Sequence, residues 1–110
     1  MSAPPNPRRV LVVEDLMILR YLSALLGRRG YTVTKADAAT AAEMLRTSQR
    51  PDVLITNTPA DFVEFAGTIP LLYLAASPDT IVAAQFSRCR VVRKPFQPEK
   101  LLEALAELLD

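Results

Sequence analysis

Residues 10–15 read Val-Leu-Val-Val-Glu-Asp, a continuous apolar run that ends in two adjacent carboxylates. A short, mostly β-branched apolar run of this kind indicates a strand that is buried on both faces. The segment that follows, residues 16–29, is amphipathic with the period of a helix, and Gly30 predicts where that helix ends. A buried strand that passes through a polar corner into an amphipathic helix predicts an α/β fold.

The same alternation continues along the rest of the chain. Further strands are predicted at 31–35, 53–56, 71–75 and 90–93, and further helices at 38–48, 79–88 and from Pro98 to the end. Between Asn57 and Pro70 the chain is too short for two loops and a full helix, since an average helix takes about 11 residues. Residues 61–66 therefore predict only a stub of helix, or none. Strands that alternate with helices in this way predict a doubly wound parallel sheet.

The composition is that of one ordinary globular domain. The chain has 110 residues, half of them hydrophobic, and its formal net charge of +1 gives no bulk attraction to nucleic acid or membranes. It has no histidine and one cysteine, Cys89, which excludes histidine-based triads, histidine–cysteine zinc sites and an internal disulfide. We expect residues 1–8 to form a flexible tail and residues 9–110 the domain. The lone cysteine, without a signal peptide or membrane-length apolar run, favours a cytoplasmic location.

Polar side chains are expected where the strands end, because ligands bind outside the carboxyl ends of parallel strands. Glu14 and Asp15 follow the first strand, and Lys94 follows the last one. The adjacent carboxylates are suited to Mg²⁺; alternatively, Asp15 caps the following helix and Glu14 lies in solvent. Lys94 either reaches across the strand ends to neutralise the acidic pair or is a solvated lysine before Pro95. Spacing alone leaves both questions open.

Three stretches together resemble the receiver domain of two-component response regulators: residues 10–15, Pro-Asp-Val-Leu-Ile-Thr at 51–56 and Lys-Pro-Phe at 94–96. The resemblance, which extends from about Arg9 to Leu109, implies a CheY-like (flavodoxin-like) five-stranded parallel sheet with strand order 2-1-3-4-5. In that family the acidic pair binds Mg²⁺, and an aspartate ending the third strand accepts a phosphoryl group from a sensor kinase. A threonine or serine ending the fourth strand and an aromatic residue on the fifth transmit the change, while the lysine contacts the phosphoryl group.

The sequence departs from this pattern at three positions that carry the family's chemistry. Asn57 stands at the acceptor position, Ala75 at the position of the relay hydroxyl, and Val91 at that of the switch aromatic. A carboxamide is uncharged and a poor nucleophile, so Asn57 cannot form an acyl phosphate. Together with the shortened third helix, these losses resemble an atypical pseudo-receiver in which only the acidic pair and the lysine remain.

The favoured function is a receiver-like domain of two-component signal transduction that works independently of phosphorylation, through protein contacts and without enzymatic activity. The expected partner is a sensor histidine kinase, another receiver or a second copy of the chain. No nucleic acid, membrane or cofactor is expected, apart from weak binding of Mg²⁺ by Glu14 and Asp15. Two alternatives stay open: a receiver with a displaced acceptor such as Asp61, and a Mg²⁺-dependent hydrolase built on the acidic pair.

Three further features have two interpretations each. Cys89 is either an exposed thiol of lowered pKa or a buried, unreactive one. Phe62 and Phe65, three apart in the stub, either fold onto the sheet or leave an apolar surface for a homodimer. A basic cluster near the last strand either meets acidic residues of a partner or is a solvated edge. Its members are Arg88, Arg90, Arg93 and Lys94.

Overall fold

Five parallel strands form one sheet in the order β2-β1-β3-β4-β5. The computed structural model describes residues 8–47 and 50–110. The strands are β1 (Arg9–Val13), β2 (Thr32–Lys35), β3 (Val53–Thr56), β4 (Leu71–Ala75) and β5 (Cys89–Arg93). The fold class and the strand order predicted from the sequence are confirmed.

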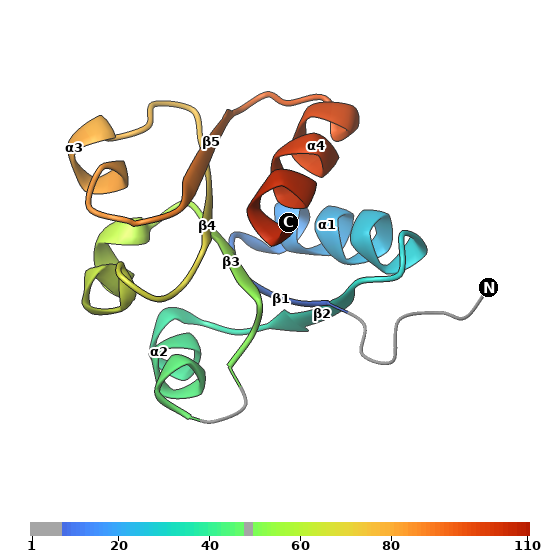
Figure 1. Ribbon diagram of the computed structural model, residues 1–110. Coiled ribbons are helices and arrows are strands. Elements are labelled where there is room, and N and C mark those ends of the chain that lie inside the picture. The colour runs from blue at the N-terminus through green and yellow to red at the C-terminus, as the bar shows by residue number, and fades with distance from the viewer. Residues whose placement is uncertain (1–7, 48–49) are drawn as a thin grey trace.

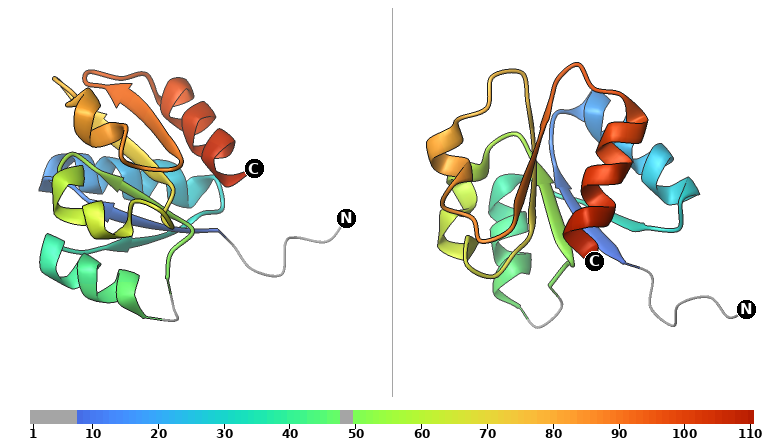
Figure 2. Two further views of the ribbon diagram at one scale, coloured as in Figure 1. Left: turned by 60° about the vertical axis from the view of Figure 1, so that its left-hand side comes forward. Right: turned by 45° about the horizontal axis from the view of Figure 1, so that its top comes forward.

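Helices cover both faces of the sheet (Figures 1 and 2). On one face lie α1 (Leu16–Arg28) and α4 (Pro98–Leu109). On the other lie α2 (Ala38–Arg46), the 3₁₀ helix η1 (Pro59–Phe65) and α3 (Thr80–Ala83). The core therefore consists of two apolar clusters, one on each side of the sheet.

Strand β1 shows why the apolar runs are continuous. Val10 and Val12 belong to the cluster under α1 and α4, whereas Leu11 and Val13 belong to the cluster under α2 and η1. Successive side chains point to opposite faces of a strand, so a sheet covered on both faces needs an apolar residue at every position. All four side chains are buried as this requires.

Local signals fix the ends of the first two helices. The Asp15 carboxylate accepts a hydrogen bond from the main-chain N–H of Ile18 at 3.1 Å, which caps the start of α1. Asp37 caps α2 through the N–H of Thr40 at 2.8 Å, and this hydrogen bond lowers the pKa of the Asp37 carboxyl. Gly30, with a φ of 88°, adopts the left-handed conformation that follows the end of α1.

Two expected segments fall partly outside the described residues. The tail expected at residues 1–8 lies outside them apart from Arg8, and so does residue 48, where the second helix was expected to end. As described, α2 ends at Arg46. None of the helices within 8–47 and 50–110 is both long enough and apolar enough to cross a membrane.

The connection between β3 and β4 contains the short helical element that the spacing predicts. η1 is a 3₁₀ helix of seven residues with a kink at Phe62, where φ is −127° and ψ is 17°. The kink allows Phe62 and Phe65 to turn inward, and their exposed fractions are 0% and 8%. These rings pack against the sheet where a longer helix would have lain. The exposed apolar surface that was the other possibility therefore does not form here.

The helix expected at 79–88 is wrong in length, since α3 is a single turn. Its start agrees with expectation, because the Asp79 carboxylate accepts hydrogen bonds from the N–H groups of Ile81 and Val82. Beyond α3, Phe86 is buried at 5% exposure, and the N–H of Ser87 donates to the carbonyl of Ala66 on the neighbouring connection. These tertiary contacts draw the chain away from a helical path and lead it into β5.

We predict that Phe62→Ala lowers the free energy of unfolding by about 3–5 kcal/mol, because it empties a fully buried site between η1 and the sheet. The neighbouring residue provides a matched control, since Val63 is 41% exposed. Val63→Ala should cost less than about 1 kcal/mol. Chemical denaturation followed by circular dichroism measures both variants. Equal losses for the two would show that the buried ring does not hold η1 on the sheet.

Candidate functional site

The register of the sheet brings the candidate residues to one edge. Val13 of β1 is opposite Thr56 of β3, so the residues that follow these strands, Glu14 and Asn57, emerge side by side. At the carboxyl ends of the next two strands, β4 and β5, Ala75 is opposite Arg93. The N–H of Lys94 donates to the Ala75 carbonyl at 2.9 Å. The carboxyl ends of β1, β3, β4 and β5 thus frame one site. We use the name strand-end pocket for this set of five residues at the strand ends, Glu14, Asp15, Asn57, Ala75 and Lys94.

The centre of the strand-end pocket is an ion pair between Glu14 and Lys94. The lysine Nζ lies 3.0 Å from Oε2 and 3.2 Å from Oε1 of the carboxylate. The Glu14 side chain is fully buried, although its main chain is partly exposed, and the Lys94 side chain is 22% exposed. The main-chain N–H of Asp15 also donates to Oε1 at 3.0 Å. The peptide bond that follows the lysine, Lys94–Pro95, is cis.

Burial makes this ion pair necessary rather than incidental. A carboxylate removed from water is costly unless it is paired with a cation and accepts hydrogen bonds. Oε2 accepts no well-directed hydrogen bond, so the nearby Lys94 ammonium is its only compensation among the described residues. The alternative in which Glu14 lies in solvent is therefore wrong. Of the two interpretations of Lys94, the structure shows the one in which the lysine reaches the acidic pair, and not the solvated lysine.

Asp15 has a separate task. Its carboxylate is exposed and caps α1, as the structural interpretation of this residue predicted. The two carboxylates are thus engaged by different groups, Glu14 by the ammonium of Lys94 and Asp15 by the helix N-terminus. Within 8–47 and 50–110, no group of three acidic, histidine or cysteine side chains is arranged to hold a metal ion.

The two remaining residues of the strand-end pocket carry no charge, and neither of two candidate residues outside it, Val91 and Asp61, contacts the ion pair. Asn57 is exposed after β3, and Ala75 is partly buried at the end of β4. Val91, on β5, is 43% exposed and presents an aliphatic surface instead of a ring. Asp61 lies in the first turn of η1, beyond the buried Pro59, and takes no part in the ion pair.

Two hydroxyl groups have roles that the sequence did not reveal. Thr56 is fully buried, and its Oγ1 accepts a hydrogen bond from the N–H of Thr58 at 3.1 Å, which shapes the chain around Asn57. The Tyr73 hydroxyl accepts one from the N–H of Asp79 at 2.9 Å and so holds the loop between β4 and α3. A phenol inside an otherwise apolar strand was the available signal, because a buried tyrosine hydroxyl needs a partner.

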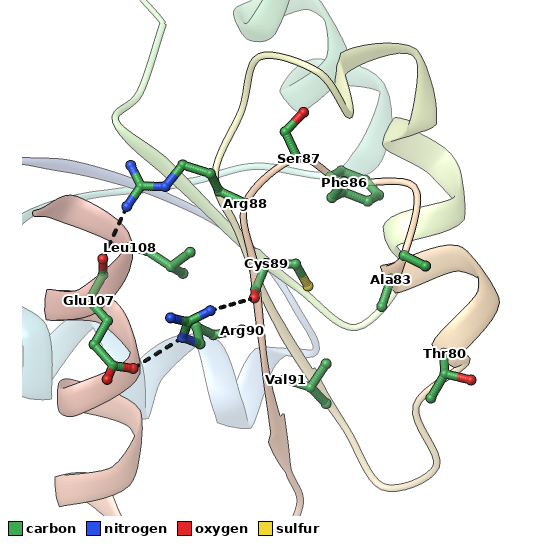
Figure 3. A pocket seen from close by; sticks show the side chains of 11 residues that line it. Thr80, Ala83, Phe86, Ser87, Arg88, Cys89, Arg90, Val91, Glu107 and Leu108 are labelled. Atoms are coloured by element: carbon green, nitrogen blue, oxygen red, sulfur yellow. Dashed lines mark hydrogen bonds and ion pairs between the residues drawn. The ribbon is translucent and has the colours of Figure 1, made fainter.

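The basic cluster is partly neutralised by α4. Arg88 donates to the main-chain carbonyl of Glu107 at 3.1 Å, and Arg90 forms an ion pair with the Glu107 carboxylate at 3.1 Å (Figure 3). Cys89 lies half-buried between these arginines on β5. Burial raises the pKa of its thiol, which outweighs the opposing effect of Arg90. The interpretation of Cys89 as an exposed thiol of lowered pKa is therefore wrong.

Comparison with known proteins identifies the fold. No protein-family model matches the sequence, and no curated protein matches it. Solved structures match over almost the whole chain. The response regulator receiver protein from Sinorhizobium medicae WSM419 is 20% identical with a TM-score of 0.76, and the match covers 96% of this chain and 95% of that chain.

Two further solved structures are similar at slightly higher identity. The signal receiver domain of an HD domain-containing protein from Pseudomonas fluorescens Pf-5 is 25% identical with a TM-score of 0.77, covering 99% of this chain and 90% of that one. The chemotaxis response regulator CheY4 of Vibrio cholerae is 25% identical with a TM-score of 0.76, covering 94% and 100%. The chain therefore has the receiver-domain fold of two-component response regulators, whereas its chemistry depends on the side chains at its own strand ends.

We predict that Lys94→Met lowers the free energy of unfolding by about 3 kcal/mol, because it leaves the Glu14 carboxylate buried without a cation. The double variant Glu14→Gln/Lys94→Met should recover most of this loss, since neither charge remains. Lys100→Met is the control, because Lys100 is exposed and forms no ion pair within the described part of the chain. Chemical denaturation of the wild type, the single variants Glu14→Gln and Lys94→Met, and the double variant completes a double-mutant cycle, and Lys100→Met is measured beside these four. Simple additivity of the Glu14→Gln and Lys94→Met effects would contradict the coupling.

Proposed function

We propose that this chain is a receiver-like binding domain of two-component signalling that acts through protein contacts and accepts no phosphoryl group. The observation that carries the proposal is the content of the strand-end pocket. It combines an uncharged Asn57 with a Glu14 carboxylate that is already paired to Lys94. The receiver fold supplies the scaffold, and these side chains argue against the reaction that the fold usually supports.

The absence of a nucleophile at Asn57 is the first argument. The resemblance to receivers implies an acyl phosphate formed on a carboxylate at this position. The nitrogen lone pair of a carboxamide is delocalised and its oxygen carries no full charge, so Asn57 offers no comparable nucleophile. Asp61 is exposed on η1 and lies outside the ion pair, and we assign it no acceptor role.

The cation that is already present is the second argument. In the strand-end pocket the Lys94 ammonium lies within 3.2 Å of both Glu14 carboxylate oxygens, so a divalent cation would have to compete with it for them. With Asp15 capping α1 and a neutral side chain at position 57, the pocket has one net negative charge. Affinity for Mg²⁺ follows the number and charge of the oxygen ligands. The proposed domain accordingly works without a metal or other cofactor and is not an enzyme.

The missing relay is the third argument. In receivers a hydroxyl at the end of the fourth strand and an aromatic side chain on the fifth respond to the phosphoryl group. Ala75 and Val91 provide neither a hydrogen-bond donor nor a ring that could change position. The surface around β5 is therefore presented in one state, which suits a domain that binds a protein partner constitutively.

We predict that the protein gains no mass when it is incubated with acetyl phosphate and Mg²⁺, because it has no carboxylate at the acceptor position. Intact-mass spectrometry measures this directly. A Mg²⁺-dependent adduct that hydroxylamine removes would contradict the proposal and would favour a receiver with a displaced acceptor. Asp61→Asn then identifies whether that residue carries the adduct.

We predict that Asn57→Asp raises the affinity for Mg²⁺ and restores some phosphoryl uptake, because it adds a third carboxylate to the strand-end pocket. The modification should occur without a conformational response, since Ala75 and Val91 are unchanged. Asn57→Gln is the matched control and should restore neither property. Mass spectrometry measures the uptake, and amide chemical shifts measure the response. Large shifts across α3 and β5 in phosphorylated Asn57→Asp would contradict this account of the relay.

A further inference from the structure

Strand β5 has an open outer edge. It pairs with β4 on one side only, since it is the last strand of the sheet. The N–H of Leu71 donates to the carbonyl of Arg88, and the N–H of Lys94 donates to the carbonyl of Ala75, both at 2.9 Å. In a parallel pair, alternate residues direct both main-chain groups to the same neighbour. The main-chain N–H and C=O groups of the even-numbered residues of β5 therefore bond to β4. Those of the odd-numbered residues point away from β4, toward the open edge of the sheet.

The outward groups of Val91 and Arg93 have no partner in the described residues. The carbonyl of Cys89 accepts a hydrogen bond from the Arg90 guanidinium at 3.2 Å, which covers the beginning of the edge. Beyond it, the N–H and C=O groups of Val91 and Arg93 form no hydrogen bond with any part of the chain within 8–47 and 50–110. Unpaired main-chain groups in a row are a template for another strand.

A groove follows this edge between two helices. Two adjoining hollows of about 430 and 840 Å³ share Thr80 of α3, Glu107 of α4 and the β5 residues Arg90 and Val91 in their linings. Figure 3 shows β5 between α3 and α4, with Cys89 and Val91 directed toward α3 and Arg90 toward α4. The groove is open because α3 is a single turn and does not extend along β5. We call this feature the β5 groove.

The charge and polarity of the β5 groove define what it can bind. Its hollows are lined by more cations than carboxylates, namely Arg88, Arg90, Arg93 and Lys100 against Glu103 and Glu107. Arg90 is neutralised by Glu107, whereas Arg93 and Lys100 have no ionic partner within the described residues. Val91, 43% exposed, adds an aliphatic surface in the middle of the strand. A ligand that matches these features is extended, acidic and partly apolar.

We propose that the β5 groove binds an extended acidic segment of a partner protein, which adds to β5 as a sixth strand. The outward groups of Val91 and Arg93 would supply the main-chain hydrogen bonds, and the free cations would select carboxylates. This inference rests on the proposed function as a protein-binding domain and names the chemistry of its partner. A second copy is disfavoured as the occupant, because another β5 would bring its own basic cluster against this one.

The test selects random linear peptides displayed on phage against the full chain. We expect acidic residues to alternate with apolar ones in the selected sequences. Proline should be absent from the bound stretch, since every residue that faces β5 must donate or accept a main-chain hydrogen bond. Amide hydrogen exchange gives the structural readout with a synthetic peptide of a selected sequence. In the free protein the N–H groups of Val91 and Arg93 should exchange quickly, and in the complex they should be protected.

A proline at position 91 separates strand addition from ordinary surface binding. Val91→Pro removes an outward N–H that the fold does not use, and proline is tolerated at such positions of edge strands. We expect it to weaken binding of the selected peptide by about tenfold, the loss that one main-chain hydrogen bond and the ring's obstruction would give. Val91→Thr keeps the donor and should bind as the wild type does. Circular dichroism verifies that both variants are folded.

Charge reversal tests the choice of partner. Arg93→Glu/Lys100→Glu should weaken binding of the acidic peptide, whereas Arg20→Glu, at an exposed position of α1, should leave it unchanged. Failure to select any peptide, or equal binding by Val91→Pro and wild type, would overturn the proposal. So would a homodimer in sedimentation velocity that Val91→Pro abolishes, because the occupant would then be a second copy. Phosphoryl uptake by the wild type would instead overturn the proposed function, so the two failures are distinguishable.

Discussion

Burial of the sheet on both faces is the constraint on which the rest of this structure depends. Helices cover each side of β1, so its side chains from Val10 to Val13 are buried. Main-chain and side-chain polar groups that need solvent or a ligand are then confined to two kinds of place, the ends of the strands and the open edges of the sheet. The strand-end pocket is of the first kind, and the β5 groove is of the second.

The two helical layers meet this constraint by different means. α1 and α4 have 13 and 12 residues and cover their face with regular apolar stripes. η1 and α3 have only seven and four, and the rings of Phe62, Phe65 and Phe86 fill the space beneath them. Aromatic side chains can replace helix length because each buries a large area from one position. Because α3 is only a single turn, no helix lies along the outer edge of β5.

The sequence predicts the elements whose signals are local, and it fails where tertiary contacts decide. The apolar run at 10–13 and the caps Asp15 and Asp37 correctly indicate the first strand and two helix starts. That the connection between β3 and β4 holds only a short helix is predicted from its chain length alone. The end of α3 cannot be predicted in this way, because the burial of Phe86 is a tertiary contact that periodicity does not encode.

For the strand-end pocket, spacing indicates Lys94 as a partner of the acidic pair. It cannot show which of the two carboxylates pairs with the lysine and which one caps the helix. For the β5 groove, the sequence indicates the basic cluster and the resemblance implies that the fifth strand is last, but the hollows themselves have no sequence signal, since they depend on how soon α3 ends.

Glu14 and Lys94 are 80 positions apart in the chain. During synthesis on the ribosome, the carboxylate of β1 emerges long before the lysine that neutralises it. Until β5 joins the sheet, Glu14 must stay hydrated, and the end of β1 cannot close over it. A nascent or truncated chain that lacks β5 therefore retains an uncompensated negative charge where β1 ends.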